Sequence, residues 1–322
     1  MRAIEVASHG GPDVLIATDV PPPVPGPTDL LVDVECAGVN FIDTYFRTGA
    51  YPQEVPYIPG SEGTGIVREV GGDVDGFAPG DRVAWASAPG SYAEQVCVPA
   101  AVAVAVPAGV SPAQAASALL QGMTAHYLVH STYPVQSGDT VLVHAGAGGV
   151  GLLLTQMAAN LGASVLTTVS TDEKEALSRA AGAVEVYRYD DDVADRARAF
   201  TGGDGVAAVY DGVGAATFDT SVAAVRTRGT VVLFGAASGP VPPVDPQRLN
   251  AAGSIYLTRP SLGAYIRDRQ ELVWRAGDVF TALADGSLNL RVGAEYPLEE
   301  AAQAHRDLEG RRTTGSIVLR VQ

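Results

Sequence analysis

A glycine-rich turn between an apolar run and a helical run limits what this chain can fold into more than any other feature. Residues 140–143 read Thr-Val-Leu-Val, and a cluster of glycines follows before apolar residues recur at helical spacing across 152–158. This order predicts a strand, a tight turn and a helix. Gly146, Gly148 and Gly151 fill the three positions of GxGxxG, in which one glycine allows the turn, one lets a pyrophosphate approach the backbone and one lets helix and strand pack closely. The turn is therefore a candidate dinucleotide site, with phosphates held at the start of the helix.

Alternating strands and helices follow this turn. The sequence predicts strands at 164–169, 184–187, 206–211 and 230–235, with helices at 173–181 and 217–225. This alternation is typical of a doubly wound parallel sheet. Gly162, Gly182 and Gly229 are predicted to end helices, because glycine tolerates the left-handed conformation found there.

The residues before the turn have a different pattern. Up to about residue 120, short alternating runs separated by proline and glycine predict a small, barrel-like β domain with strands at 4–6, 30–36, 63–70, 82–85 and 92–98. Helices are expected at 111–120 and 124–129. In the tail we expect helices at 265–284 and 299–308 and a last strand at 316–321.

Length and composition narrow the class of protein. With 322 residues, 47% of them hydrophobic and 18% charged, the chain is expected to form two globular domains. A net charge of −15 without a cluster of Lys and Arg argues against nucleic acid as a partner. No signal peptide or membrane-spanning run is visible, which predicts a cytoplasmic protein without a membrane partner. Cys36 and Cys97 are interpreted as small buried hydrophobes.

Three segments carry a resemblance to a known family: residues 37–49 (Ala-Gly-Val-Asn-Phe-Ile-Asp-Thr-Tyr-Phe-Arg-Thr-Gly), residues 59–63 (Pro-Gly-Ser-Glu-Gly) and residues 144–151. Together with further matching segments, they make the chain resemble the medium-chain dehydrogenases/reductases. Within that superfamily it is similar to the zinc-independent NADPH:quinone oxidoreductases, the zeta-crystallin group. The matching segments span essentially the whole chain; the further ones are 121–125, 209–214, 234–239 and 258–262.

The resemblance implies a domain arrangement. A GroES-like, β-rich catalytic domain would comprise residues 1–124, a Rossmann-type NADP-binding domain residues 125–258, and residues 259–322 would return to the catalytic domain. The cofactor would lie in the cleft between the two domains. A homodimer is expected through edge strands around residues 249–257, although residues 254–257 could also form an internal strand.

The resemblance also bears on metal binding. Zinc-dependent relatives have Cys, His and His where this chain has Asn40, Phe41 and Ser61, and these three residues are poor zinc ligands. The four-cysteine structural zinc lobe is missing too. We therefore expect no metal, and we interpret His144, which closes a buried strand, as structural.

The end of the second predicted strand indicates which cofactor is bound. An NAD site usually has an acidic residue there, whereas this strand ends at Ser170 with Lys174 four residues on, which suits the 2′-phosphate of NADPH. In the family, the equivalents of Ser170, Lys174 and Tyr189 line the phosphate pocket. Two alternatives stay open: Ser170 with Glu173 could be a capping box, and Asp172 could favour NADH. Asp190 departs from the basic residue that relatives often carry after the tyrosine.

The segment expected to face the nicotinamide is a loop that supplies the candidate catalytic residues Asn40, Asp43, Tyr45, Arg47 and Tyr51. By resemblance, Tyr45 touches the nicotinamide end of the cofactor and donates to substrate or simply packs. Asn40 is a candidate donor to a developing oxyanion. Asp43 could pair with Arg47 or cap a helix.

The remaining cofactor contacts follow from the resemblance and from the glycine turn. Phosphates should rest on Gly148, Gly149, Val150 and Gly151. The other positions expected at the cofactor are Tyr45, Thr124, Gly146, Gly212, Phe234, Gly235, Ala236, Thr258 and Arg259.

Three functions remain open. Without zinc, the reduced acceptor must be an anion that is stable by itself, which favours quinones and α,β-unsaturated carbonyls. The first hypothesis is an NADPH-dependent quinone reductase, and the second is an NADPH-dependent enoyl or alkenal reductase. A non-catalytic NADPH-binding protein, either crystallin-like or RNA-binding, is the alternative of another class.

Overall fold

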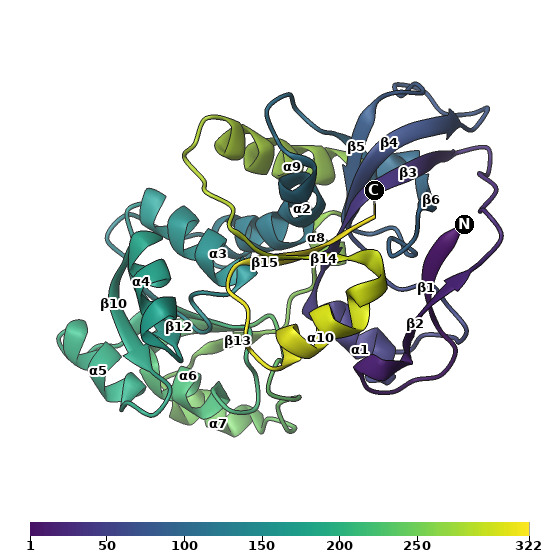
Figure 1. The fold of residues 1–322 in the computed structure, drawn as a ribbon. Helices are drawn as coiled ribbons and strands as arrows, with labels where there is room; N and C mark the ends of the chain where they lie inside the picture. Colours follow the sequence, from purple (N-terminus) through teal and green to yellow (C-terminus); the bar gives the residue numbers. More distant parts are fainter. Residues whose placement is uncertain (322) are drawn as a thin grey trace. The chain divides into compact units, whose positions relative to one another are not determined.

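The computed structural model describes residues 1–321, and in it the chain divides into two units (Figure 1). One unit combines Met1–Met123 with Ile266–Gln322, and the other is Thr124–Tyr265. The sequence had suggested a return to the first unit at residue 259, whereas the second unit extends to Tyr265. Among residues 1–321, none of the helices combines the length and the apolar character needed to cross a bilayer.

The discontinuous unit is built on a seven-stranded sheet. Its strand order is β14-β15-β3-β4-β5-β7, and β6 pairs with β3. The strands are β3 (Asp29–Val39), β4 (Gly63–Val70), β5 (Arg82–Trp85), β6 (Gln95–Pro99), β7 (Val104–Ala105), β14 (Val292–Pro297) and β15 (Ser316–Arg320). A separate antiparallel pair consists of β1 (Arg2–Val6) and β2 (Leu15–Asp19).

The two ends of the chain meet in this unit. β15 pairs antiparallel with β3, with Ile317 opposite Val39, so the last strand completes a sheet begun near the N-terminus. Its helices are α1 (Phe41–Thr48), most of α2 (Pro112–Tyr127), α9 (Arg269–Ala284) and α10 (Ala301–Glu309), with short 3₁₀ turns at Pro12–Val14, Ala100–Val102 and Leu298–Glu300. One buried cluster, including Ile4, Tyr92 and Ala304, joins the first strand to α10.

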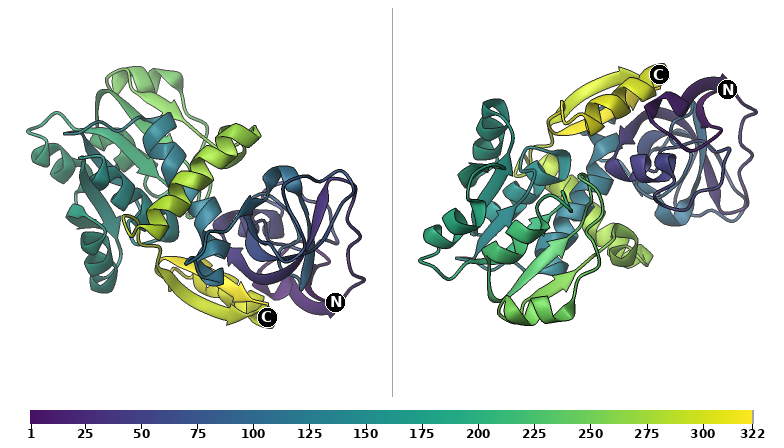
Figure 2. Two further views of the ribbon diagram at one scale, coloured as in Figure 1. Left: turned by 90° about the horizontal axis from the view of Figure 1, so that it is seen from above. Right: turned by 90° about the horizontal axis from the view of Figure 1, so that it is seen from below.

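The continuous unit is a six-stranded parallel sheet in the order β10-β9-β8-β11-β12-β13. Helices connect successive strands and flank the sheet (Figure 2). The strands are β8 (Thr140–Val143), β9 (Ser164–Val169), β10 (Ala183–Arg188), β11 (Val206–Asp211), β12 (Val225–Leu233) and β13 (Tyr256–Thr258). The helices are α3 (Gly149–Asn160), α4 (Asp172–Ala180), α5 (Val193–Phe200), α6 (Phe218–Ala224), α7 (Pro246–Ala251) and α8 (Leu262–Tyr265).

The predicted fold class is confirmed: a doubly wound parallel sheet accompanies a β-rich domain. Strand order reverses between β8 and β11, and in sheets of this kind ligands bind beyond the carboxyl ends of the strands at the reversal. The strand–turn–helix at residues 140–160 lies there, because β8 is one of the two strands that flank the reversal.

Several predicted elements differ from the structure. The helical runs expected at 111–120 and 124–129 form one helix, α2, which continues into a π-helical turn over Leu128–Thr132. No proline interrupts residues 121–123, and Gly122 lies inside the helix at a position where a Cβ would approach Val279 to 2.8 Å. The segment after Asn40, expected to be a loop, forms α1. The prediction missed β2, β7, β14, α5, α7 and α8.

The helix-ending glycines were predicted with mixed success. Gly162 and Gly182 follow α3 and α4 with φ of 87° and 107°, which confirms their role. The prediction for Gly229 was wrong, because this residue lies inside β12, which begins five residues earlier than expected. In the tail, α9 begins at Arg269 rather than at residue 265.

Candidate active site

Two of the three GxGxxG glycines are needed for packing, while the third leaves open backbone. A Cβ at Gly151 would overlap the carbonyl group of Ala145, and one at Gly146 would lie 2.6 Å from Thr167. At Gly148 the nearest atom would be the Ala145 carbonyl oxygen at 3.4 Å. Gly148 immediately precedes α3, whose first N–H groups have no partner within the helix. Bare backbone, free donors and a helix N-terminus together fit a diphosphate.

The left-handed residue of this turn is Ala145, with φ of 57°, rather than a glycine. Its N–H donates to the Tyr189 hydroxyl at 3.1 Å, which ties the turn to the residue that follows β10. His144, the preceding residue, is buried and its Nδ1 lies 2.9 Å from Thr168 Oγ1. Burial lowers the pKa of His144, so the imidazole is neutral and packs beneath the turn.

A second group of polar side chains lies beyond β9. Lys174 Nζ donates to Ser170 Oγ at 3.4 Å; Ser170 directly follows β9 and is exposed, and Lys174 lies half-buried in the first turn of α4. The capping-box alternative for Ser170 was wrong: the N-cap of α4 is Thr171, whose side chain accepts from the Lys174 N–H. The Asp172 carboxylate is paired with Arg188 at 2.5 Å. An ammonium and a hydroxyl are suited to a phosphate group.

The loop after β11 is organised by Asp211, which is completely buried. Its carboxylate accepts hydrogen bonds from the N–H groups of Val213 and Gly214 and from the hydroxyls of Thr217 and Ser221. The His144 N–H donates to the Tyr210 carbonyl at 3.0 Å, so this loop and the glycine turn leave adjacent strands at the point of reversal.

Tight backbone contacts explain the glycines of this loop. A Cβ at Gly212 would lie 2.8 Å from the Phe234 ring, and one at Gly235 would overlap the Gly212 carbonyl. Gly214 has φ of 92° and lies against Ala236. Of the other residues predicted to bind the cofactor, Thr124 is buried on α2, Thr258 ends β13, and Arg259 donates to the Pro260 carbonyl.

In the discontinuous unit, Asn40 joins a chain of buried hydrogen bonds. Its Nδ2 donates to Glu62 Oε2 at 2.8 Å, and its Oδ1 accepts from Gln121 Nε2 at 3.0 Å. Glu62 Oε1 accepts from the Leu120 N–H at 2.7 Å. Asn40 is 5% exposed and Glu62 is completely buried. One N–H of the Asn40 amide is left without a partner among these bonds.

Of the two alternatives left open for Asp43, the structure shows the helix cap and not the ion pair with Arg47. Both residues are buried, but Asp43 Oδ2 accepts from the Asn40 N–H at 2.8 Å and from the Tyr92 hydroxyl at 3.2 Å. The bond from Asn40 confirms the alternative that Asp43 caps the helix. Burial raises the pKa of Asp43 to about 7, and the two hydrogen bonds oppose this rise.

Arg47 turns instead to the C-terminal helix of the same unit. Its Nη2 contacts Glu309 at 2.8 Å, its Nη1 lies 3.0 Å from His305 Nδ1, and its Nε donates to the Gly10 carbonyl. Since Arg47 only donates, His305 Nδ1 accepts, and its protonated Nε2 faces the Tyr92 hydroxyl at 3.1 Å. Burial and the Arg47 charge lower the pKa of His305 to about 3, so this imidazole is neutral. The network fixes α1 against α10.

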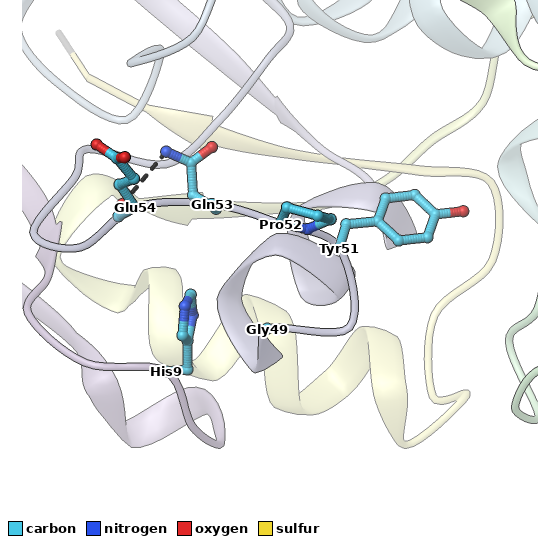
Figure 3. Close-up of a pocket in the computed structure, with 6 residues that line it drawn as sticks. All are labelled: His9, Gly49, Tyr51, Pro52, Gln53 and Glu54. Atoms are coloured by element: carbon cyan, nitrogen blue, oxygen red, sulfur yellow. Dashed lines mark hydrogen bonds between the residues drawn. The ribbon is translucent and has the colours of Figure 1, made fainter.

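The two predicted tyrosines are more accessible. The rings of Tyr45 and Tyr51 lie 5.2 Å apart, and the Tyr51 side chain is 37% exposed. Tyr51 borders a pocket of about 520 Å³ lined by His9, Gly49, Tyr51, Pro52, Gln53 and Glu54. Its ring points away from His9 and Gln53 (Figure 3).

Comparison with known proteins places the chain in a family. Residues 26–108 match the alcohol dehydrogenase GroES-like domain, and residues 149–275 match the model described as zinc-binding dehydrogenase. A curated quinone oxidoreductase from Pseudomonas aeruginosa is 43% identical over 99% of both chains. This protein belongs to the quinone oxidoreductase family of the medium-chain dehydrogenases/reductases. The predicted family is thereby confirmed, and with it the prediction that the chain is an oxidoreductase.

Two further members of this family group are informative. A mycobacterial protein whose structure was solved in complex with NADPH shares 57% identity, with a TM-score of 0.98 and full coverage of both chains. A 2-haloacrylate reductase from a Burkholderia species is 39% identical over 99% of this chain and 98% of its own.

The sequence indicated the glycine turn and the Ser170–Lys174 pair. It missed four buried partners, Glu62, Tyr92, Gln121 and His305, and the exposed Glu309 that contacts Arg47. Glu62 and Gln121 lie in segments that carry the family resemblance, so their positions offered a signal. Their contacts depend on β3, β4 and α2 meeting in three dimensions, and no local pattern reports this. Across residues 1–321, no three His, Cys, Asp or Glu side chains converge as metal ligands would.

Proposed function

We propose that this member of the quinone oxidoreductase family is an NADPH-dependent reductase that delivers hydride to quinones without zinc. The observation that carries the proposal is the open backbone at Gly148, together with the Lys174–Ser170 pair beyond the neighbouring strand. The cofactor is NADPH, because this pair suits its 2′-phosphate and the 57% identical mycobacterial protein was solved with NADPH.

Each part of the site has a distinct task. The N–H groups at the start of α3 would hold the diphosphate, and Lys174 with Ser170 and Tyr189 would hold the 2′-phosphate. Asp211 keeps the loop at Gly212 in place beside the turn. Bound NADPH supplies the hydride.

The acceptor is proposed from the relatives and from the donor chemistry. The Pseudomonas aeruginosa relative is a quinone oxidoreductase. Asn40, Phe41 and Ser61 offer no strong zinc ligand at the three positions where zinc-dependent relatives have them. The spare N–H of Asn40 would donate to the oxygen that gains negative charge, with Tyr45 and Tyr51 beside the substrate. A quinone or enone anion is delocalised, so hydrogen bonds stabilise it adequately.

One observation favours a second acceptor class. The 39% identical Burkholderia protein is a 2-haloacrylate reductase, and a haloacrylate is an α,β-unsaturated acid. An enoyl or alkenal reductase is therefore the alternative function on the same scaffold.

Competing acceptors separate the two functions. Initial rates of NADPH oxidation are measured with 1,4-benzoquinone, with a medium-chain 2-enal and with 2-chloroacrylate. A kcat/KM at least about tenfold higher for the quinone would support the proposal, since that ratio corresponds to about 1.4 kcal/mol of selective transition-state stabilisation. A preference for either unsaturated carbonyl compound would assign the enzyme to the alternative.

We also propose a homodimer. β13 is at the edge of the parallel sheet, where among residues 1–321 it pairs only with β12, and Tyr256 on this strand is 65% exposed. An edge strand with an exposed aromatic side chain is suited to pairing with a second copy.

A further inference from the structure

We propose that Glu62 is a positioning residue that holds the Asn40 amide in one of its two orientations, with Nδ2 as the donor available to substrate. The proposal rests on the proposed function, in which Asn40 donates to the oxygen of the acceptor. It assigns a role to a buried carboxylate that the sequence analysis left without one.

Both hydrogen bonds of the Glu62 carboxylate have a defined direction. The Leu120 N–H is a backbone donor and cannot accept, so the Glu62 oxygen facing it at 2.7 Å must accept. The other Glu62 oxygen, when the group is ionised, accepts from Asn40 Nδ2 at 2.8 Å. The ionised Glu62 carboxylate can only accept hydrogen bonds, so the Asn40 amide must turn its Nδ2 toward Glu62.

The oxygen of the Asn40 amide is bound by Gln121, which does not fix its orientation. Asn40 Oδ1 accepts from Gln121 Nε2 at 3.0 Å, and Gln121 Oε1 has no hydrogen-bond partner among the described residues. If the Asn40 amide turned around, the Gln121 amide could turn as well and accept from Asn40 through Oε1, so the bond between them would be kept. Of the two hydrogen-bond partners of the Asn40 side chain, only Glu62 therefore fixes the orientation of the Asn40 amide.

The fold leaves space for the Glu62 carboxylate. A Cβ at residue 38 would lie 2.5 Å from Glu62 Oε2, so the carboxylate rests on the bare backbone of Gly38. Glu62 is completely buried, although an ionised carboxylate is costly to bury. A structural role alone would be served by a neutral side chain.

The orientation of the Asn40 amide depends on the protonation of Glu62. Burial raises the pKa of Glu62 to about 8, the N–H groups of Leu120, Asn40 and Leu119 oppose the rise, and Asp43 on α1 adds to it. Protonated Glu62 would present an O–H to Asn40, and the amide would turn around to accept from it. Asn40 therefore holds the productive orientation increasingly as pH rises through this range.

The substitution Glu62→Gln tests the proposal. A glutamine must place its oxygen toward the Leu120 N–H and its NH₂ toward Asn40, so Asn40 and then Gln121 reverse. All three hydrogen bonds are remade and the protein stays folded, while the donor offered to substrate is replaced by an oxygen. We expect kcat to fall about a hundredfold, as when an oxyanion donor is removed, with the KM for NADPH unchanged.

A double-mutant cycle distinguishes positioning from a merely structural role. Asn40→Ala should lower kcat by about the same factor, and Glu62→Gln added to Asn40→Ala should lower it no further. The rise of kcat with pH near 8 should be absent from Glu62→Gln. Glu295→Gln, which alters a surface ion pair with Arg320 in the same unit, is the matched control and should behave as wild type.

The outcomes are separable. If Asn40→Ala retains wild-type kcat, the role proposed for Asn40 fails and this inference fails with it. If Asn40→Ala is impaired while Glu62→Gln is active, or if the two losses multiply, the proposed function stands and the positioning role is wrong. Should Glu62→Gln not fold, Gln121→Met removes the bond at the other end of the amide and, with Gln95→Met as its control, should keep kcat near the wild-type value. A loss of about a hundredfold in Gln121→Met would show that Gln121 rather than Glu62 orients Asn40 and would overturn the proposal.

Discussion

At the scale of single residues, Lys174 can be tested selectively, because it is the only lysine of the sequence. Lys174→Ala should raise the KM for NADPH about tenfold or more and leave that for NADH nearly unchanged, since one charge-assisted bond to the 2′-phosphate contributes about 1.5–3 kcal/mol. Steady-state kinetics with both cofactors measure this. Acetylation with an amine-selective reagent should have the same effect and should be slowed by NADPH. Equal losses with the two cofactors would contradict the assignment.

Two buried carboxylates, Asp43 and Glu62, and two buried imidazoles, His144 and His305, govern how stability depends on pH. The raised pKa values of Asp43 and Glu62, about 7 and 8, mean that the folded state binds more protons than the unfolded state up to those values. Their contribution to stability is therefore lost as pH rises through this range. The lowered pKa values of His144 and His305, the latter about 3 against an ordinary 6.5, have the opposite effect, but only below 6.5.

We therefore expect the free energy of unfolding to fall between pH 6.5 and 8, by at most about 1.4 kcal/mol per pH unit for each group. Urea titrations at several pH values measure it. Asp43→Asn should make the profile shallower. A stability that stays constant across the same interval would contradict this, because it would show that these carboxylates are already ionised in the folded protein at pH 6.5.

At the scale of elements, the two kinds of glycine in the strand–turn–helix should respond differently to a methyl group. Gly151→Ala places a Cβ against the Ala145 carbonyl and should destabilise the fold by about 1–3 kcal/mol. Gly148→Ala finds its nearest atom at 3.4 Å, so it should fold as wild type and bind NADPH more weakly. Thermal unfolding and fluorescence titration with NADPH separate the two effects. A stable Gly151→Ala or a tightly binding Gly148→Ala would be inconsistent with this description of the turn.

Local patterns predicted the elements of the parallel sheet well, because β-branched runs and glycine ends are local signals. The strand at 206–211 matches β11 to the residue. Elements whose packing depends on tertiary contacts were missed: α1 is short and buries its polar residues Asp43, Thr44 and Arg47, and β14 alternates between half-buried and exposed residues beside β15. Likewise, Ser170, Lys174 and the glycines could be named from the sequence, whereas the Glu62–Asn40–Gln121 chain joins residues 22 and 81 positions apart.

At the scale of the whole molecule, the exposed edge of β13 should control assembly. Tyr256→Asp introduces a charge on an exposed side chain and should leave the fold intact while converting a dimer to monomers. Light scattering coupled to gel filtration measures the mass directly. A wild-type monomer, or a variant that remains dimeric, would place the contact elsewhere.

The most direct test of the account is the rate of NADPH oxidation with 1,4-benzoquinone after exhaustive chelation, with the metal content of the enzyme measured in parallel and NADH as the second cofactor. We expect full activity in metal-free enzyme and a kcat/KM at least about tenfold higher for NADPH than for NADH. Activity that disappears with the metal and returns with zinc, or a preference for NADH, would contradict the account.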